Sequence, residues 1–191
     1  MDCYTLRANR QATGLSLAAM ARVIGTSATN LSAYERGAKH PRPATVQRMV
    51  AATHAGADSP IYRHRLVTVP AAAAAIRSGL RHSWTTGDLL RIVRELRSNA
   101  KHLVTDEDRA LFYAEPSTTG DRRWDALLAA VTEMDALRTG TPVPSWARGH
   151  ELPHLWFVGA QPSTHAHSLV HTPSSLAVRG IVLDGAALES V

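Results

Sequence analysis

Hydrophobic side chains recur every three or four residues near the start of the chain, as they do along one face of an amphipathic helix. The pattern predicts a first helix over residues 6–12, which Gly14 ends because glycine readily adopts the left-handed conformation. Ser16 is a favourable N-cap for a second helix, and Gly25 provides the tight turn after it. The apolar positions of that second helix are Leu15, Met20, Val23 and Ile24.

A third and a fourth helix are predicted directly after this turn. Ser27 is placed to cap the third, which ends at Gly37, and residues 45–55 form the fourth after two prolines. Two short helices joined by a tight glycine turn, the second with small polar residues on its outer face, are typical of a helix-turn-helix. We therefore expect residues 1–58 to form a DNA-binding bundle of four or five helices.

The residues that carry this motif closely resemble the Xre/lambda-repressor family of DNA-binding domains. They are Gly14-Leu15-Ser16, Met20-Ala21, Ile24-Gly25-Thr26-Ser27, Leu31 and Tyr34-Glu35-Arg36-Gly37. The resemblance implies that the third helix reads DNA, with contacts from Ser27, Ala28, Thr29, Asn30, Ser32, Ala33, Arg36, Lys39 and Arg42. Arg10 and Glu35 match an ion pair between the first and third helices, and contact of Arg10 with DNA or solvent is the alternative.

The chain departs from this family at the positions that hold phosphates and read bases. Leu17 stands where many relatives have a glutamine that binds a phosphate. The base-reading positions lack Gln, Asn and Arg, whose bidentate contacts discriminate between bases by ~1–3 kcal/mol, and Thr29 can make one hydrogen bond. We therefore expect modest specificity for each operator half-site, raised by homodimerisation on double-stranded DNA and by DNA shape.

Residues 59–70 are interpreted as a linker, in which Arg63 and Arg65 are candidates for contact with the DNA backbone. Residues 71–191 are expected to form a helical domain for partner binding or dimerisation, so the predicted fold class is all-α. Its expected helices cover residues 71–79, 86–99, 106–113 and 173–178, with a further one that begins at Asp121.

After Gly140, prolines and tryptophans predict an irregular tail, with residues 179–183 extended and a last turn capped by Asp184. Several short motifs resemble the C-terminal region of actinobacterial helix-turn-helix proteins that neighbour a nucleotidyltransferase toxin. They are Thr119-Gly120-Asp121, Trp124-Asp125-Ala126-Leu127-Leu128-Ala129, Pro144-Ser145-Trp146, Trp156-Phe157, Arg179-Gly180-Ile181-Val182-Leu183-Asp184 and Leu188-Glu189-Ser190-Val191. The resemblance implies an antitoxin that binds its toxin and represses its own promoter. A stand-alone regulator whose second domain dimerises or senses a ligand is the alternative.

Charge is distributed unevenly along the chain. Residues 1–101 carry 15 Lys and Arg against 5 Asp and Glu, whereas residues 102–191 carry 6 against 11. A basic half is suited to a polyanion such as DNA, and the acidic half is expected to hold a protein partner. The single cysteine and the absence of a secretion signal or membrane-spanning pattern predict a cytoplasmic, nucleoid-associated protein.

Candidate chemistry elsewhere in the chain is sparse. The spacing of His150, His154, His165, His167 and His171 invites a metal site, but no Cys or adjacent carboxylate completes a ligand set. No glycine-rich phosphate loop or Gly-x-Ser-x-Gly motif occurs, and Cys3 lies at the terminus, where it is a poor nucleophile. The acidic residues 106–108 suit the first turn of a helix. We therefore expect no catalytic residue, no metal and no cofactor, and hence no enzyme.

Overall fold

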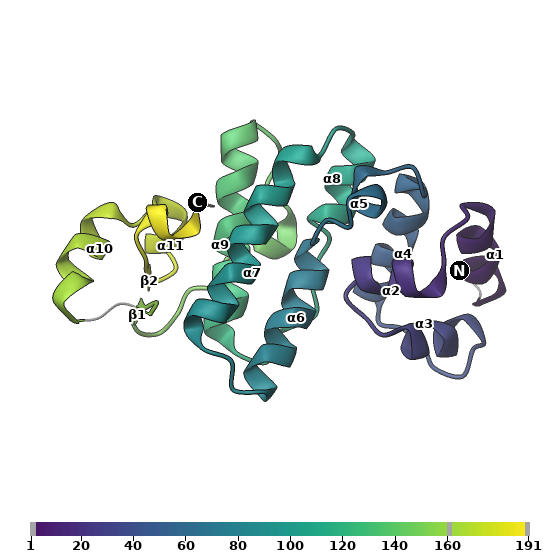
Figure 1. The fold of residues 1–191 in the computed structure, drawn as a ribbon, viewed down its shortest axis with the longest axis horizontal. Helices are drawn as coiled ribbons and strands as arrows, with labels where there is room; N and C mark the ends of the chain where they lie inside the picture. Colours follow the sequence, from purple (N-terminus) through teal and green to yellow (C-terminus); the bar gives the residue numbers. More distant parts are fainter. Residues whose placement is uncertain (1–2, 160–161, 190–191) are drawn as a thin grey trace. The chain divides into compact units, whose positions relative to one another are not determined.

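The computed structural model describes residues 3–159 and 162–189. Short helices dominate it, and the strands of the described residues are β1 (Trp156–Phe157) and β2 (Ile181–Val182), so the predicted all-α class is confirmed (Figure 1). The chain divides into two compact units. Unit 1 comprises Met1–Ala74 with His102–Ser117, and unit 2 comprises Ala75–Lys101 with Thr118–Val191.

Unit 1 begins with the four predicted helices, and the predicted side-chain caps are confirmed. The Oγ atoms of Ser16 and Ser27 accept hydrogen bonds from the amides of Ala19 and Asn30, each at 3.1 Å. The fourth helix begins at Pro43 rather than at residue 45, because a proline suits the first helical turn. The helices of this unit are α1 (Cys3–Ala12), α2 (Leu17–Val23), α3 (Ala28–Glu35), α4 (Pro43–Ala55), α5 (Pro60–Arg63), the start of α6 (Val69–Arg81) and α8 (Asp106–Phe112).

Residues 59–70 differ from the linker expected from the sequence. They contain α5, and the side chains of Ile61 and Leu66 are buried in the core of unit 1. Thr68 donates a hydrogen bond to the carbonyl of Val23, and Arg22 donates one to the carbonyl of Leu66. The segment therefore packs against α2, since its apolar side chains are removed from water there. This long-range packing left no local signal in the sequence.

The turn after α2 illustrates how closely this segment packs. Gly25 has φ +70°, and a Cβ atom there would lie 2.2 Å from the carbonyl oxygen of Pro70. Gly14 has the same φ, but a Cβ atom there would meet nothing within 4 Å. We expect Gly25→Ala to lower the free energy of unfolding of unit 1 by about 1–3 kcal/mol more than Gly14→Ala, because only Gly25→Ala adds a collision to the left-handed strain. Equal losses in urea denaturation followed by far-UV circular dichroism would contradict the close approach of Pro70.

Unit 2 is built around α7 (Thr86–Asn99) and α9 (Arg122–Thr139), which pack against each other (Figure 1). Thr85 and Asp88 form a capping box at the start of α7. Asp121 is the N-cap of α9, which begins one residue after the predicted start. α9 is buried on all sides over its middle, where residues 126–132 are all buried, with Leu127, Leu128 and Val131 in the core. The remaining elements are the end of α6, α10 (His165–His171), α11 (Ser174–Ala177) and the 3-10 turns η2 (Ser145–Ala147), η3 (Pro162–Thr164) and η4 (Gly185–Leu188). A further turn, η1 (Ala100–His102), follows α7.

The tail is more ordered than the sequence indicated. Within the tail that was predicted to be irregular, the histidine-rich segment forms α10, bounded by η3 and by Pro173. β1 pairs in parallel with β2, and Trp156 and Phe157 lie opposite Ile181 and Val182. Arg179, which is buried, donates hydrogen bonds to the carbonyls of Ala147 and Ser175 and pairs with Glu133 of α9. These contacts fasten the tail to the core of unit 2.

Candidate nucleic-acid interface

The outer face of α3 carries small side chains. Ser27, Ala28 and Thr29 are exposed at its start, and Asn30 and Ser32 are half-buried. Cβ atoms of helical residues three or four positions apart share a face, so Ala28 and Ser32 lie on the same side as Arg36. This face has room to approach another macromolecule closely and offers hydroxyl groups for hydrogen bonds.

Ala33 does not belong to this outer face, although the family resemblance implied that it reads bases. It is only 8% exposed. The chain that leaves α3 folds back beside it, and the amides of Ala38 and Lys39 donate hydrogen bonds to its carbonyl at 2.9 and 3.3 Å. The return of the loop covers the side chain, a tertiary effect that helical spacing alone does not reveal.

Three exposed cations follow the small face of α3. Arg36 donates a hydrogen bond to the hydroxyl of Ser32. The Nζ atom of Lys39 lies 3.1 Å from Oδ1 of Asn30. Arg42 precedes α4 and is exposed. The basic groups therefore lie at the C-cap of α3 and along the loop to α4, where they can meet phosphates beside a helix that lies in the major groove.

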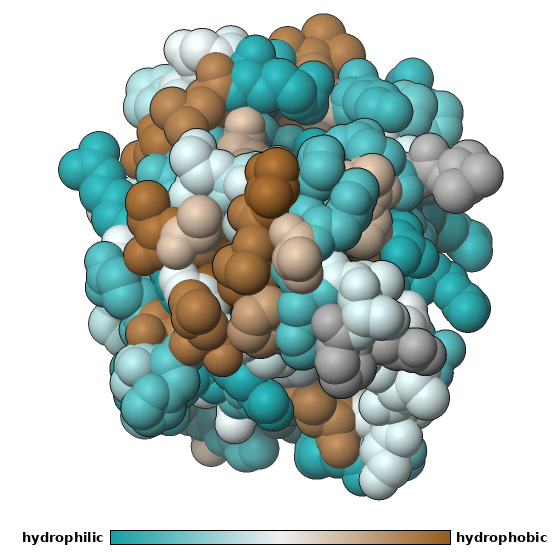
Figure 2. Space-filling view, turned by 90° about the vertical axis from the view of Figure 1, so that its left-hand side faces the viewer, coloured by the Kyte–Doolittle hydropathy of each residue, from teal (hydrophilic) through white to brown (hydrophobic). Residues whose placement is uncertain are grey.

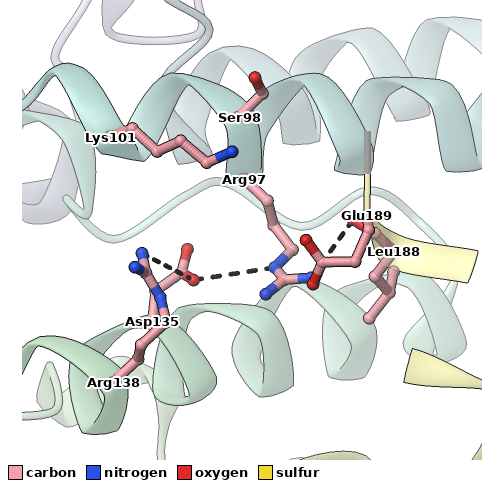
Figure 3. A pocket seen from close by; sticks show the side chains of 7 residues that line it. All are labelled: Arg97, Ser98, Lys101, Asp135, Arg138, Leu188 and Glu189. Carbon is pink, nitrogen blue, oxygen red and sulfur yellow. Dashed lines mark hydrogen bonds and ion pairs between the residues drawn. The ribbon is translucent and has the colours of Figure 1, made fainter. Parts of the chain in front are cut away.

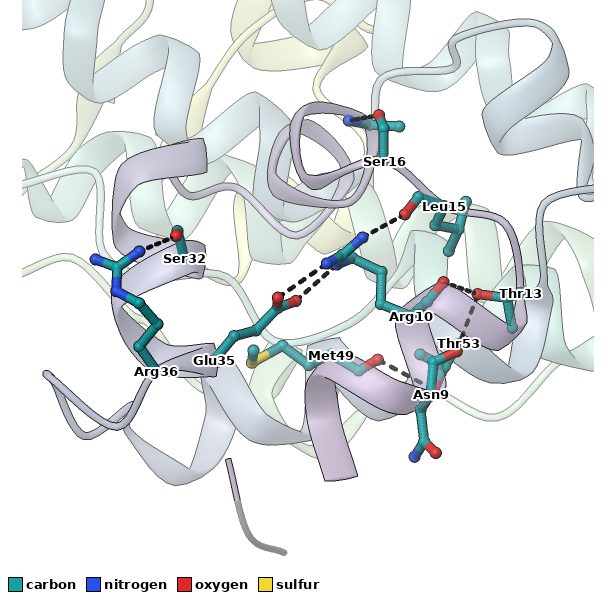
Figure 4. A network of polar contacts seen from close by, with 11 residues as sticks. Asn9, Arg10, Thr13, Leu15, Ser16, Ser32, Glu35, Arg36, Met49 and Thr53 are labelled. Atoms are coloured by element: carbon teal, nitrogen blue, oxygen red, sulfur yellow. Dashed lines mark hydrogen bonds and ion pairs between the residues drawn. The ribbon is translucent and has the colours of Figure 1, made fainter. Parts of the chain in front are cut away.

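A buried ion pair fixes the orientation of α3 (Figure 4). Nε and Nη2 of Arg10 lie 2.7 and 2.9 Å from the two carboxylate oxygens of Glu35, and Nη1 donates to the carbonyl of Leu15 at 2.7 Å. The hydrogen bond to Glu35 raises the pKa of Arg10. Both side chains point inward, whereas Arg36 and Ser32 lie on another side of α3. The pair thus joins α1, α3 and the turn before α2, and Arg10 is not presented to a ligand.

A second buried arginine was missed by the sequence analysis. Arg48 of α4 is 2% exposed and donates hydrogen bonds to the carbonyl of Glu115 and to the hydroxyls of Thr45 and Ser117. Its spacing of three residues from Thr45 and four from Ala52, on the buried face of α4, was the available signal. Its charge is used to hold the segment after α8 and is not part of the exposed basic group.

The charge of each unit differs from the charge of each half of the sequence. The residues of unit 1 include 10 Lys and Arg against 7 Asp and Glu, and those of unit 2 include 11 against 9. Net charges of +3 and +2 follow, because the acidic start of α8 belongs to unit 1 and the basic helix α7 belongs to unit 2. The expected acidic second domain is therefore not a structural unit, and charge no longer argues for a partner there.

Unit 2 contains a polar pocket of about 110 Å³ between α7, α9 and η4 (Figure 3). Arg97 at its centre pairs with Glu189 at 2.7 Å and approaches Asp135 at 3.7 Å, and Arg138 approaches the same aspartate at 3.8 Å. Both carboxylates are thus engaged by arginines, Lys101 adds a third cation to the lining, and the pocket is smaller than the roughly 300–1,000 Å³ of most ligand sites. Its clear role is to attach the C-terminal turn to the two helices.

The histidines of the tail lie apart from such a cluster. The ring of His165 stacks on Phe157, His167 stacks on His171, and Nε2 of His167 lies 3.1 Å from Oδ2 of Asp184. In residues 3–159 and 162–189, no three His, Cys, Asp or Glu side chains are close enough together to hold a metal ion. Within the same described ranges, no helix combines the length and apolar content that a membrane span requires.

Comparison with known proteins supports the assignment of α1–α4. Residues 5–59 match the family model of a helix-turn-helix domain. Comparison with curated proteins and with solved structures gave no match. The matched residues contain both the small face of α3 and the three cations after it. They support a DNA-binding regulator.

Proposed function

We propose that the protein represses transcription by binding double-stranded operator DNA, with α3 of its helix-turn-helix in the major groove. The observation that carries the proposal is the exposed small face of α3 followed by Arg36, Lys39 and Arg42. Phosphate contacts give affinity and orientation, whereas contacts to base edges give specificity. The proposal implies a cytoplasmic protein associated with the nucleoid.

Within this proposal Ala28 and Thr29 meet base edges. The methyl groups of both side chains suit thymine methyl groups, and the Thr29 hydroxyl can hydrogen-bond to a base. Arg36, Lys39 and Arg42 contact phosphates, with Ser27, Asn30 and Ser32 supporting them at the groove edge. Because one such face discriminates weakly between bases, two copies on a two-fold operator are needed for a specific complex.

Thr29→Ala tests the base-reading role. Loss of one hydrogen bond is expected to weaken binding to the selected operator about 2–10-fold and leave binding to unrelated DNA unchanged. Thr5→Ala, which removes an exposed hydroxyl from the same unit on α1, is the matched control. Fluorescence anisotropy with both DNAs is the measurement. A Thr29→Ala protein with unchanged operator affinity and preference would show that α3 is not the reading helix.

A more specific version of the proposal is that the protein is an antitoxin and that its unit 2 binds a nucleotidyltransferase toxin. The support is the resemblance of the short motifs from Thr119 to the end of the chain. Co-expression with a toxin-like gene that overlaps or adjoins this one is expected to restore growth and give a complex on size exclusion. Failure of both results would favour a stand-alone regulator.

A stand-alone regulator needs a dimer surface or an effector site in unit 2. A hollow of about 420 Å³ lies against Trp84, Asp88, Arg91, Ile92 and Glu95, within the size range of small-molecule sites. Trp84 is held there by the hydrogen bond from its amide to the carbonyl of Gly79. The hollow favours an effector as the second candidate, and operator release by an added metabolite would support it.

A further inference from the structure

Large apolar side chains are exposed together at one end of unit 2. Leu155, Leu169, Val170 and Val178 are 62%, 52%, 78% and 66% exposed, and they are four of the seven exposed large hydrophobic residues in the described part of the chain. Figure 2 shows hydrophobic residues gathered over the face that carries α10, α11, β1 and β2. We call these four residues the apolar patch.

The apolar patch rests on an ordered base. The amide of Leu152 donates to the carbonyl of Arg179 at 3.0 Å, and the amide of Trp156 donates to the carbonyl of Gly180 at 2.8 Å. These bonds bring the segment of Leu155 beside the segment that follows Val178. Helix α10, which carries the other two patch residues, packs against β2. The patch is therefore held by contacts within the tail, around the pair of β1 and β2.

The patch also lies in a segment with almost no formal charge. Between residues 150 and 178 the one residue among Asp, Glu, Lys and Arg is Glu151, although such residues make up 19% of the chain. Five of the ten histidines, counted as neutral at pH 7, lie in this segment instead. Depletion of charge around an apolar centre is the compositional sign of a protein interface, and of homodimer interfaces above all.

We propose that the apolar patch is the surface through which two copies of this chain associate about a two-fold axis. A two-fold axis brings each group near the axis close to its own copy, where like charges repel, so a segment with almost no formal charge suits such an axis. A different partner could instead be met by opposite charges, which the segment does not offer. This proposal rests on the proposed function, because the dimer is the form that would bind the two-fold operator.

The apolar patch supplies a large part of the apolar area that a dimer needs. Four side chains of this size, each more than half exposed, present on the order of 400 Å² of apolar surface, within the roughly 300–600 Å² of the largest and often functional patch on a monomer. A standard interface buries about 800 Å² on each partner, of which roughly 65% is apolar in homodimers, or about 500 Å². The patch thus supplies most of the apolar area that one subunit needs, and the surrounding histidine, serine and threonine side chains can form the polar rim.

Val170→Asp in the full chain tests the proposal, because it puts a carboxylate into the patch of both copies. Val104 of unit 1 is 75% exposed and lies outside the patch, so Val104→Asp is a matched control. By sedimentation equilibrium at 0.15 and 1 M NaCl, we expect the wild type to dimerise at both salt concentrations, since apolar association is not weakened by salt. Val170→Asp and Val178→Asp are expected to raise the dimer dissociation constant about 100-fold, with Val104→Asp and all circular dichroism spectra unchanged.

The proposal is overturned if the wild type is monomeric at about 100 µM, well above the range of a functional dimer. It is also overturned if both patch variants dimerise normally. A monomeric wild type that forms a complex with the co-expressed toxin, where Val170→Asp abolishes that complex, would assign the patch to the toxin and also overturn the proposed dimer.

DNA binding distinguishes the proposed dimer from the proposed function. Monomeric Val170→Asp should bind a single half-site with the affinity of the wild type and should lose cooperativity on a two-site operator. Failure of the wild type to bind any DNA would reject the proposed function alone.

Discussion

Glu35→Ala is expected to destabilise unit 1 by about 3–5 kcal/mol, the usual loss when one partner of a buried ion pair is removed. The Arg10 side chain is 9% exposed beside Glu35, and the variant leaves its guanidinium with no carboxylate there. Unfolding relieves that cost, because the cation regains water. Hydrogen exchange of the amides in α1 and α3, which belong to unit 1, measures the loss separately from unit 2.

The double variant Arg10→Met with Glu35→Leu is the control for this prediction. It replaces the pair by apolar side chains of similar volume, which is often neutral or stabilising at such sites. Protection of α1 and α3 is therefore expected to recover towards the wild-type level. A Glu35→Ala loss below about 1 kcal/mol would mean that water or another group reaches Arg10 and that the pair does not fix α3.

Local rules were sufficient for most helix boundaries of the fold. Ser16 and Ser27 were predicted as N-caps from their residue type and from the apolar pattern that follows, and the structure confirms both. Capping depends on two or three neighbouring residues, so the sequence contains the whole signal. The Arg10–Glu35 contact spans 25 residues, and it came from the family resemblance because spacing alone cannot place the two side chains together.

The features that the sequence did not predict depend on packing between distant segments. Ala33 is covered by the loop that returns over it, and residues 59–70 are drawn onto α2 by Ile61 and Leu66. The acidic half of the sequence is divided between the units, because α8 packs on α4 while α9 packs on α7. The net charge counted along the chain therefore gave the wrong sign for the second domain. The three cations after α3 are close together in the sequence, so their position could be predicted.

The triple variant Arg36→Ala, Lys39→Ala and Arg42→Ala is expected to weaken DNA binding about 100-fold at 0.15 M salt, for specific and unrelated DNA alike. Each lost phosphate contact removes about 0.9 from the slope of log affinity against log salt, so the slope falls by about 2.7. Over the interval from 1 M to 0.15 M salt, that change corresponds to roughly a factor of 100. All three side chains are exposed, so the variant should fold as the wild type does.

A control of equal charge separates contact from general attraction. Arg81→Ala, Arg122→Ala and Arg148→Ala together remove the same three charges from exposed positions of unit 2. Long-range attraction depends on net charge and affects both triple variants, whereas counterion release at the contact affects only the variant beside α3. Equal slopes of log affinity against log salt for the two triple variants would show that the DNA phosphates contact residues other than the cations after α3. A slope lowered only by the α3 variant would show that the cations after the small face hold the DNA backbone, leaving sequence preference to Thr29 and its neighbours.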